Sequence, residues 1–288
     1  MPAAWQLRTT SLTLDRPRVL GIVNVTPDSF SDGGRFFSGE AAVAHGIRLA
    51  EAGADMLDIG GESTRPQGAV PVDVAEELAR VLPVVRGLRE RLPAVPISVD
   101  TVKSAVAAAV LDEGVEAIND VSAFRLDPVG AEVCARAGAG VILMHSRGTV
   151  ADMATYQHAT YGRDVAAEVL SELQASARQT EAAGVAPGRI ALDPGVGFSK
   201  RSEQSLAVLA ALPRFAALGY PLVVGASRKR FIGELTGEPD PAHRVEGTIG
   251  ANVMALALGA RIFRVHDVRH ARRALDVGWA ILQSGVDE

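Results

Sequence analysis

The sequence predicts an α/β fold, a (β/α)8 TIM barrel formed by a single domain with a short N-terminal hairpin. Short apolar runs alternate with segments of helical periodicity along the chain, which is typical of repeated βα units. Most of the helical segments are followed by glycine, the usual residue after a helix. The apolar runs end in polar residues, as expected where parallel strands meet a functional rim: Asn24, the stretch 58–65, Asp100, Asn119, His145, Asp193, Ser227 and His266.

The elements follow in order along the 288 residues of the domain, with a hairpin over 4–16 and the barrel over 17–285. Strands are expected at 19–25, 56–59, 97–99, 117–118, 141–144, 190–192, 222–224 and 262–265. Helices are expected near 40–52, 72–92, 103–112, 129–137, 163–183, 202–218, 241–258 and 268–283. The helix-ending glycines are Gly53, Gly114, Gly138, Gly184, Gly219 and Gly259.

An open, doubly wound sheet is the alternative fold. It would normally carry a glycine-rich dinucleotide turn after an early strand, and no GxGxxG pattern occurs there. The longest connections, 26–38, 62–71 and 146–162, all follow expected strands, so we expect lids at the functional rim.

Composition narrows the class of protein. The net charge of −5 and the lack of a basic face argue against a nucleic-acid partner. The single cysteine, Cys134, cannot form an internal disulfide, and we expect it to be buried and inert in a reducing compartment. Apolar stretches such as 251–260 are shorter than the roughly 20 residues of a membrane span, and the first residues lack a signal pattern. We therefore expect a cytoplasmic protein with no membrane segment.

The segment 24–34 combines turn-forming residues with an amide and carboxylates. Asn24 and Asp32 offer oxygen ligands of the kind that hold hydrated Mg²⁺ beside a phosphate. The alternative is an ordinary turn-rich loop, although an amide that ends an apolar strand needs a partner.

The segment 58–66 leaves a strand through two glycines. It then presents hydroxyl groups, among them that of Thr64, and the guanidinium of Arg65, which can bind a carboxylate or a phosphate. A structural Gly-Gly turn followed by a solvated arginine is the alternative.

Asp100, Asn119 and Asp193 end three strands and are expected to form a polar floor inside the barrel mouth. A heterocycle with an N–H beside an amino group would bind such a carboxylate through two hydrogen bonds. The alternative is a structural network with Lys229 and buried water.

The residues after the last two strands could bind an anion. Ser227 and Lys229 follow the seventh strand, where these barrels often bind phosphate. Arg264 and His266 share one side of the eighth strand by period-two alternation and could grip a leaving anion. A solvated turn and a structural histidine are the alternatives. No HxH, HExxH, CxxC or GxSxG pattern supports a zinc site or a serine hydrolase.

With these motifs in place, the chain resembles the dihydropteroate synthases of the pterin-binding barrel family from residue 19 to the last helix. The segments that carry the resemblance are GIVNVTPDSFSDGG (21–34), DIGGESTRP (58–66), SVDT (98–101), IND (118–120), LMH (143–145), DPGVGFSK (193–200), SRK (227–229) and RVHD (264–267). Val196 and Ser199 stand where phenylalanine and glycine are frequent, and Ser146 and Arg147 follow LMH.

The resemblance implies a transferase of folate synthesis that condenses 6-hydroxymethyl-7,8-dihydropterin diphosphate with 4-aminobenzoate, with Mg²⁺ as cofactor. It implies a homodimer and a target of sulfonamides, which imitate aminobenzoate. The implied pterin-binding residues are Asp100, Asn119, Asp193 and Lys229. The implied diphosphate-binding residues are Asn24, Thr64, Arg65, Arg264 and His266, with Asn24 and Asp32 at the metal. The implied aminobenzoate-binding residues are Thr64, Arg65, Pro66, Phe198 and Ser227, and the catalytic ones Asp100, Lys229, Arg264 and His266.

On this resemblance the expected mechanism is dissociative: diphosphate leaves, the ring delocalises the cation, and the aniline nitrogen attacks. Two rivals share the barrel. A methyltetrahydrofolate-dependent methyltransferase needs no diphosphate grip, and a catalytically silent paralogue is expected to lose loop residues that are intact here.

Overall fold

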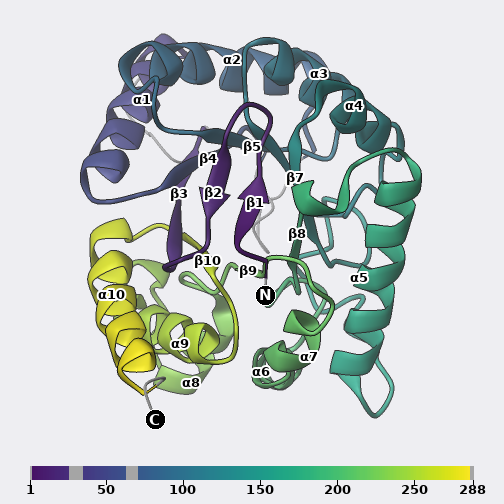
Figure 1. Cartoon of the computed structure of the whole chain (residues 1–288), viewed down its shortest axis with the longest axis vertical. Helices are drawn as coiled ribbons and strands as arrows, with labels where there is room; N and C mark the ends of the chain where they lie inside the picture. The colour runs from purple at the N-terminus through teal and green to yellow at the C-terminus, as the bar shows by residue number, and fades with distance from the viewer. Residues whose placement is uncertain (1, 26–34, 63–70, 286–288) are drawn as a thin grey trace.

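A ring of eight parallel strands forms the centre of the computed structural model, which describes residues 2–25, 35–62 and 71–285 (Figure 1). The strands follow one another in the order β8-β7-β6-β5-β4-β3-β10-β9. A bridge between Leu192 and Leu222 joins the two ends and closes the barrel. The strands are β3 (Arg18–Asn24), β4 (Met56–Gly60), β5 (Ile97–Asp100), β6 (Ala117–Asp120), β7 (Gly140–Met144), β8 (Ile190–Asp193), β9 (Val223–Val224) and β10 (Ile262–Val265). The predicted (β/α)8 barrel is thus confirmed.

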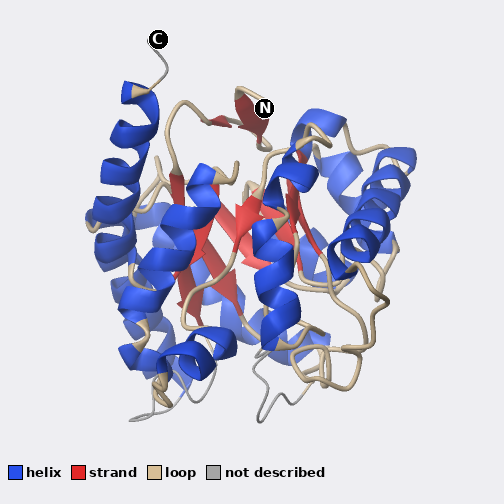
Figure 2. Ribbon diagram, turned by 90° about the horizontal axis from the view of Figure 1, so that it is seen from below, coloured by secondary structure: helices blue, strands red, loops and turns tan. Residues whose placement is uncertain are grey.

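Helices surround the ring on its outer side (Figure 2). They are α1 (Arg35–Glu51), α2 (Val74–Arg91), α3 (Ser104–Asp112), α4 (Val129–Ala137), α5 (Val165–Ala182), α6 (Ser202–Ala210), α7 (Leu212–Ala216), α8 (Arg230–Thr236), α9 (Val245–Ala257) and α10 (Val268–Ser284). Short 3-10 turns lie at η2 (Pro187–Arg189) and η3 (Pro241–His243). The apolar faces of these helices pack on the outward side chains of the strands, which forms the main core.

Three expected helices differ from the structure, and one helix was not expected. The expected helix 40–52 begins earlier, at Arg35. The expected helix 202–218 is two helices, because Pro213 near the start of α7 has no N–H with which to continue α6. The expected helix 241–258 begins only at Val245, after the 3-10 turn at Pro241. Helix α8 is seven residues long, which is too short for a clear periodic pattern.

The glycines that were expected to end helices have the backbone conformation this role requires. All six have positive φ, which L-residues with a side chain rarely adopt: Gly53, Gly114, Gly138, Gly184, Gly219 and Gly259. Among the helix starts, the side chains of Asp73 and Asp164 accept hydrogen bonds from the first turns of α2 and α5.

The N-terminal hairpin closes one end of the barrel. Strands β1 (Ala4–Gln6) and β2 (Ser11–Thr13) pair antiparallel and lie beyond that end (Figure 2). The Trp5 ring is fully buried, and its Nε1 donates to the carbonyl oxygen of Arg189 at 2.8 Å. Hairpin and barrel share one apolar cluster: Trp5, Leu7, Leu12, Leu14, Leu20, Met56, Ala117, Ile142, Ala191, Val223 and Ile262. The hairpin therefore seals the end opposite the one at which the strands finish.

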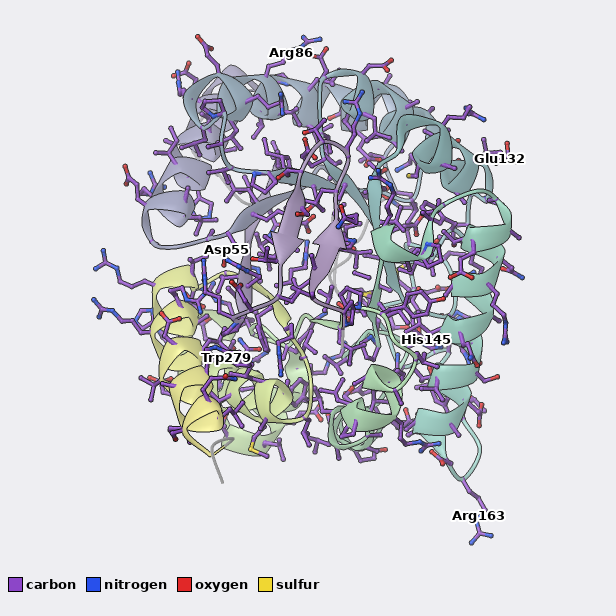
Figure 3. The ribbon with its side chains drawn as sticks, in the orientation of Figure 1. Asp55, Arg86, Glu132, His145, Arg163 and Trp279 are labelled. Atoms are coloured by element: carbon purple, nitrogen blue, oxygen red, sulfur yellow. The ribbon has the colours of Figure 1, made fainter. Side chains whose placement is uncertain are left out.

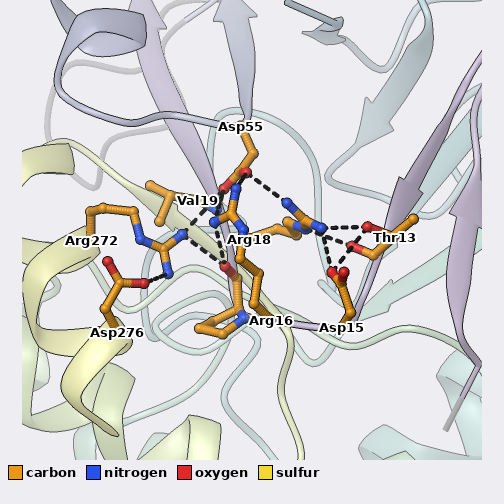
Figure 4. A network of polar contacts seen from close by, with 9 residues as sticks. Thr13, Asp15, Arg16, Arg18, Val19, Asp55, Arg272 and Asp276 are labelled. Atoms are coloured by element: carbon orange, nitrogen blue, oxygen red, sulfur yellow. Dashed lines mark hydrogen bonds and ion pairs between the residues drawn. The ribbon is translucent and has the colours of Figure 1, made fainter. Parts of the chain in front are cut away.

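A charged network ties the hairpin connection to the first and last parts of the barrel (Figure 4). The Asp55 carboxylate, just before β4, accepts from Val19 N at 2.8 Å and from Arg18 Nη1 at 3.0 Å. It also pairs with Arg16 and with Arg272 of α10. Because Asp55 is almost fully buried and has several donors, this network fixes β3 against α10.

Two expectations from composition can be compared with the structure. Cys134 is buried in α4, and burial raises the pKa of its thiol to about 12, so it is an inert core residue. Within residues 2–25, 35–62 and 71–285, no helix combines the length and apolar character needed to cross a membrane.

Candidate active site

Residues at or next to the carboxyl ends of four neighbouring strands form one layer inside the barrel. Asn24 of β3 is in register with Gly60 of β4, Gly60 with Asp100 of β5, and Asp100 with Asn119 of β6. Residues in register on parallel strands point to the same side of the sheet. That side is the interior, because Met56, in the same alternation as Gly60, belongs to the interior cluster. The side chains of this layer therefore line the interior of the barrel, near the end at which the strands finish.

Asp58 is the centre of the polar contacts in this region. It lies two residues before Gly60 on β4, so its side chain also points inward, and it is fully buried. Its carboxylate accepts from Ser98 Oγ at 2.5 Å, from Asn119 Nδ2 at 3.0 Å and from Arg264 Nε at 2.6 Å. A buried carboxylate needs such donors to remain charged.

Arg264 of β10 joins this network to Asp100. Its Nη2 donates to Asp100 Oδ2 at 2.9 Å, and the side chains of Arg264, Asp58 and Asp100 are 21%, 0% and 15% exposed. Burial raises the pKa of Asp100 to about 7; Arg264 opposes this rise, and Asp58 adds to it. Burial alone would lower the pKa of Arg264, but the two carboxylates hold it above its usual value.

Asp193 of β8 flanks Arg264 on the other side. A Cβ built at Gly225 would lie 3.6 Å from Asp193 Oδ2 and 4.0 Å from Arg264 Cβ, so both side chains border that glycine. The Asp193 carboxylate accepts from the backbone N–H of Gly195 at 2.7 Å. Burial raises its pKa, although the Gly195 N–H and the charges of Lys229 and Arg264 oppose the rise.

Lys229 lies over an aromatic ring and interacts electrostatically with Asp193. Its ammonium nitrogen is 3.7 Å from the ring centroid of Phe198. Burial lowers the pKa of Lys229 to about 7; Arg264 adds to this, and Asp193 opposes it. The predicted residues Asp193, Phe198 and Lys229 are thus brought together.

Two glycines face the space between these side chains. A Cβ at Gly60 would lie 3.7 Å from Asn24 Oδ1 and 3.8 Å from Asp100 Cβ, and Gly225 takes the corresponding place beside Asp193. A larger residue at either position would project among the polar groups. The glycines thus leave room for the face of a flat ligand.

The loop after β9 brings Ser227 to His266. Ser227 Oγ lies 3.0 Å from His266 Nδ1 and accepts from the His266 backbone N–H at 3.2 Å. Arg228 forms a two-point pair with Asp267, at 2.9 Å for Nε and 2.7 Å for Nη2. This pair fixes the loop that carries Ser227 and Lys229.

Ser199 is a departure from the family pattern that the structure explains. Its φ is +48°, the region in which glycine is favoured. Its hydroxyl accepts from Arg147 N at 2.9 Å and lies 2.6 Å from Arg147 O and 3.0 Å from Met153 O. These hydrogen bonds fasten the loop after β8 to the loop after β7 and offset the cost of the backbone conformation.

Four predicted site residues, Asp32, Thr64, Arg65 and Pro66, lie outside the described residues. Within the described parts of the chain, no group of three or more His, Cys, Asp or Glu residues could hold a metal ion. At the base of the 63–70 segment, Lys103 Nζ lies 3.0 Å from Glu62 Oε2 and 2.5 Å from Glu77 Oε2.

Sequence reasoning gave no site role to Ser98 or Gly225, and it named Asp58 and Gly60 only as part of the segment 58–66. Asp58 carried a signal that could have been used, since a carboxylate inside an apolar strand and in phase with Gly60 must face the interior. Its partner Arg264 is 206 residues away in the chain, so the pairing depends on barrel closure.

The arrangement can bind a flat, polar heterocycle and stabilise charge. Asp100 and Asp193 offer acceptors, while Asn119 and Lys229 offer donors. The buried carboxylates also favour positive charge that develops on a ligand between them.

The comparisons with known proteins agree with this arrangement. The model of a family described as "Pterin binding enzyme" matches residues 20–266. The chain is 43% identical over 279 residues to the dihydropteroate synthase of Mycobacterium leprae, covering 95% of this chain and 96% of that protein. It superposes with a TM-score of 0.90 and 48% identity on the Xanthomonas albilineans dihydropteroate synthase with 4-aminobenzoic acid, covering 99% of each chain. A structure of that enzyme with 7,8-dihydropteroate gives a TM-score of 0.86 and 46% identity, covering 98% of this chain and 99% of the other.

Proposed function

The chain belongs to the pterin binding enzyme family, and from this premise we propose that it is a transferase of folate synthesis. Its reaction would join 6-hydroxymethyl-7,8-dihydropterin diphosphate to 4-aminobenzoate and release diphosphate and 7,8-dihydropteroate. The observation that carries the proposal is the set of inward carboxylates, Asp58, Asp100 and Asp193, gathered around Arg264. The relatives with aminobenzoate and dihydropteroate support the same substrates.

Each substrate has a proposed place. The pterin ring would lie between Asp100, Asn119, Asp193 and Lys229, with the Asp193 carboxylate accepting from the ring N–H and the amino group. Aminobenzoate would pack near Phe198 and Ser227, with Thr64, Arg65 and Pro66 completing its site. The diphosphate would meet Asn24, Thr64, Arg65, Arg264 and His266.

The donor set fits a magnesium ion that is held mainly by substrate. Mg²⁺ is commonly bound through one or two protein oxygens, substrate phosphates and water, so it needs no cluster of protein carboxylates. Asn24 Oδ1 at the layer facing the mouth is a suitable oxygen, and Asp32 would be the second ligand. When bound, the ion would neutralise the charge of the leaving diphosphate.

The proposed chemistry is dissociative. The bond between the methylene carbon and the diphosphate oxygen breaks, and its electron pair leaves with diphosphate. Asp100 stabilises the cation spread over the dihydropterin ring, while Arg264 and His266 stabilise the departing anion. The aminobenzoate nitrogen then forms the new C–N bond and releases a proton to solvent. Phe198, together with the segments 26–38 and 62–71, would exclude water that competes with the aminobenzoate nitrogen for the cation.

Diphosphate release tests this proposal. The purified protein should release diphosphate only when pterin diphosphate, 4-aminobenzoate and Mg²⁺ are all present, and sulfonamides should compete with aminobenzoate. Asp193→Asn should abolish release, while the control Glu132→Gln removes a carboxylate that is 61% exposed on α4 and should leave it unchanged. Release without aminobenzoate, or methyl transfer from methyltetrahydrofolate instead, would contradict the assignment.

We further propose that the protein is a cytoplasmic homodimer that associates through its late helices. Exposed apolar side chains gather there on neighbouring helices: Leu206 of α6, Leu235 of α8 and Met254 of α9 line one groove at 37%, 63% and 61% exposure. A second copy would cover this surface and remove its apolar area from water.

Met254→Glu should convert this dimer to a monomer, because a carboxylate would then be buried without a partner. The matched control is Val129→Glu on α4, where a 51% exposed apolar residue lies away from the groove. Light scattering during gel filtration measures the mass. A monomeric wild-type protein, or a dimer unaffected by Met254→Glu, would rule out this interface.

A further inference from the structure

Lys200, a buried residue outside the proposed substrate contacts, hydrogen-bonds to the backbone of the loop after β8. The side chain of Lys200 is among the largest that are fully enclosed, with 1% exposure of the residue. Its Nζ donates to Gly195 O at 3.0 Å and to Phe198 O at 3.1 Å, and lies 2.9 Å from His145 Nδ1. The three hydrogens of an ammonium group thus have three acceptors.

The contact with Glu172 assigns the tautomer of His145. Because a carboxylate can only accept, the hydrogen of the neutral ring must lie on Nε2, and Nδ1 is left to accept from Lys200 Nζ. Nε2 is 3.0 Å from Glu172 Oε2 on α5, so it donates to that carboxylate. Arg147 pairs with the same carboxylate. A neutral histidine therefore links the buried ammonium to a carboxylate on α5, the helix beside which Figure 3 labels His145.

The electrostatics agree with a neutral histidine. Burial first, and then the neighbouring charge of Lys200, lowers the pKa of His145 to about 4. Burial lowers the pKa of Lys200 to about 7, which Asp193 and Glu172 oppose and Arg147 and Lys229 reinforce.

Lys200 holds Phe198 in the loop after β8, whereas Asp193 is held by strand pairing. Asp193 belongs to β8, and its carbonyl oxygen accepts from His145 N at 2.9 Å, so the strand pairing itself holds it. Phe198 lies past the end of β8, and Lys200 holds its carbonyl oxygen. The turn between them lies hard against β7, because a Cβ at Gly195 would be 2.0 Å from His145 O.

We propose that Lys200, acting through His145 and Glu172, is a positioning residue that sets the place of Phe198 and thereby the affinity for aminobenzoate. This inference rests on the function proposed above and deepens it. Lys200 itself touches no substrate. It would act on the aminobenzoate side of the site, because the pterin side is held by the sheet.

The kinetic test replaces Lys200 with methionine, which has a similar length and no donor. Lys200→Met should raise KM for aminobenzoate about tenfold, the effect of losing about one well-made hydrogen-bonded support. It should raise KM for pterin diphosphate by a clearly smaller factor, through the charge lost near Asp193. Equal rises in both constants, or no rise for aminobenzoate, would overturn the proposal, since a general structural defect would not discriminate between the substrates.

A second pair of variants decides the matter if Lys200→Met does not fold. His145→Asn keeps an acceptor near the position of Nδ1, whereas His145→Leu has a similar size and none. The asparagine variant should retain the aminobenzoate KM within about twofold, and the leucine variant should raise it several-fold. Similar constants for the two variants would contradict a role for the acceptor.

Nitrogen-15 NMR of the histidine side chains tests the network without any turnover. The His145 signal, assigned by its loss in His145→Asn, should show an unprotonated Nδ1 and a protonated Nε2 at pH 7. The opposite tautomer would overturn the network even in an active enzyme. Conversely, a protein with this tautomer and no diphosphate release would contradict the proposed function and leave the assigned hydrogen-bond direction supported.

Discussion

Replacing Asp100 with asparagine is expected to lower kcat by about 10²- to 10³-fold, the usual effect of removing one group that stabilises charge in the transition state. Asparagine keeps the shape and one acceptor, so the dissociation constant for pterin diphosphate should change less than about threefold. Toward the bound pterin, the carboxylate charge takes effect once the ring becomes cationic. Turnover and pterin binding by calorimetry therefore separate the two effects.

The pH dependence of the same variant provides its control. Burial raises the pKa of Asp100 to about 7, so the carboxylate form is lost as the pH falls through neutrality. Wild-type kcat/KM, which reports the free enzyme, should fall on the acid side of about pH 7, and Asp100→Asn should lack this limb. Equal losses of turnover and pterin binding, or an acid limb that persists in the variant, would contradict the role given to Asp100.

Replacing Arg264 with methionine is expected to lower the free energy of unfolding by about 3 kcal/mol, as when one partner of a buried ion pair is removed. The reason is that Asp58, fully buried, and Asp100, 15% exposed, would lose their shared cation. The variant should also lose nearly all activity, because the proposed support for the leaving diphosphate is gone. Urea denaturation followed by circular dichroism measures the stability, and diphosphate release measures the activity.

Two further proteins make this measurement specific. Arg86→Met removes an arginine that is 60% exposed and paired with Glu113, and it should leave the free energy of unfolding almost unchanged. Adding Asp58→Asn to Arg264→Met removes one unpaired charge and should restore part of the lost stability. Loss of Arg264 removes a charge that opposes the raised pKa of Asp100, so the deficit should be larger at pH 8 than at pH 5. A deficit independent of pH and of Asp58 would point to lost packing instead.

The sequence predicted the barrel because its signals are local. Apolar runs, helical periodicity and terminal glycines depend on residues close together in the chain, and the glycines indeed have positive φ. The division of α6 from α7 at Pro213 was a local signal that was overlooked.

The contacts of the site could be predicted only in part. Strand-end positions were enough to place Asp100 and Asn119 in the interior layer. The partners of Asp58 come from β5, β6 and β10. The link from Lys200 to Glu172 runs from the loop after β8, through the residue after β7, to α5. Such pairings depend on how side chains meet after the sheet closes, and no periodicity in one segment encodes them.

The N-terminal hairpin determines how substrates and products enter and leave the barrel. Trp5 and its apolar neighbours fill the end of the barrel at which the strands begin. Substrates and products of the proposed reaction must therefore enter and leave through the same opening, at the carboxyl ends of the strands. Dihydropteroate, which contains the pterin ring, must dissociate from the pterin site before the next pterin diphosphate can bind. The product should therefore inhibit by direct competition with pterin diphosphate, and its release should limit the rate of turnover.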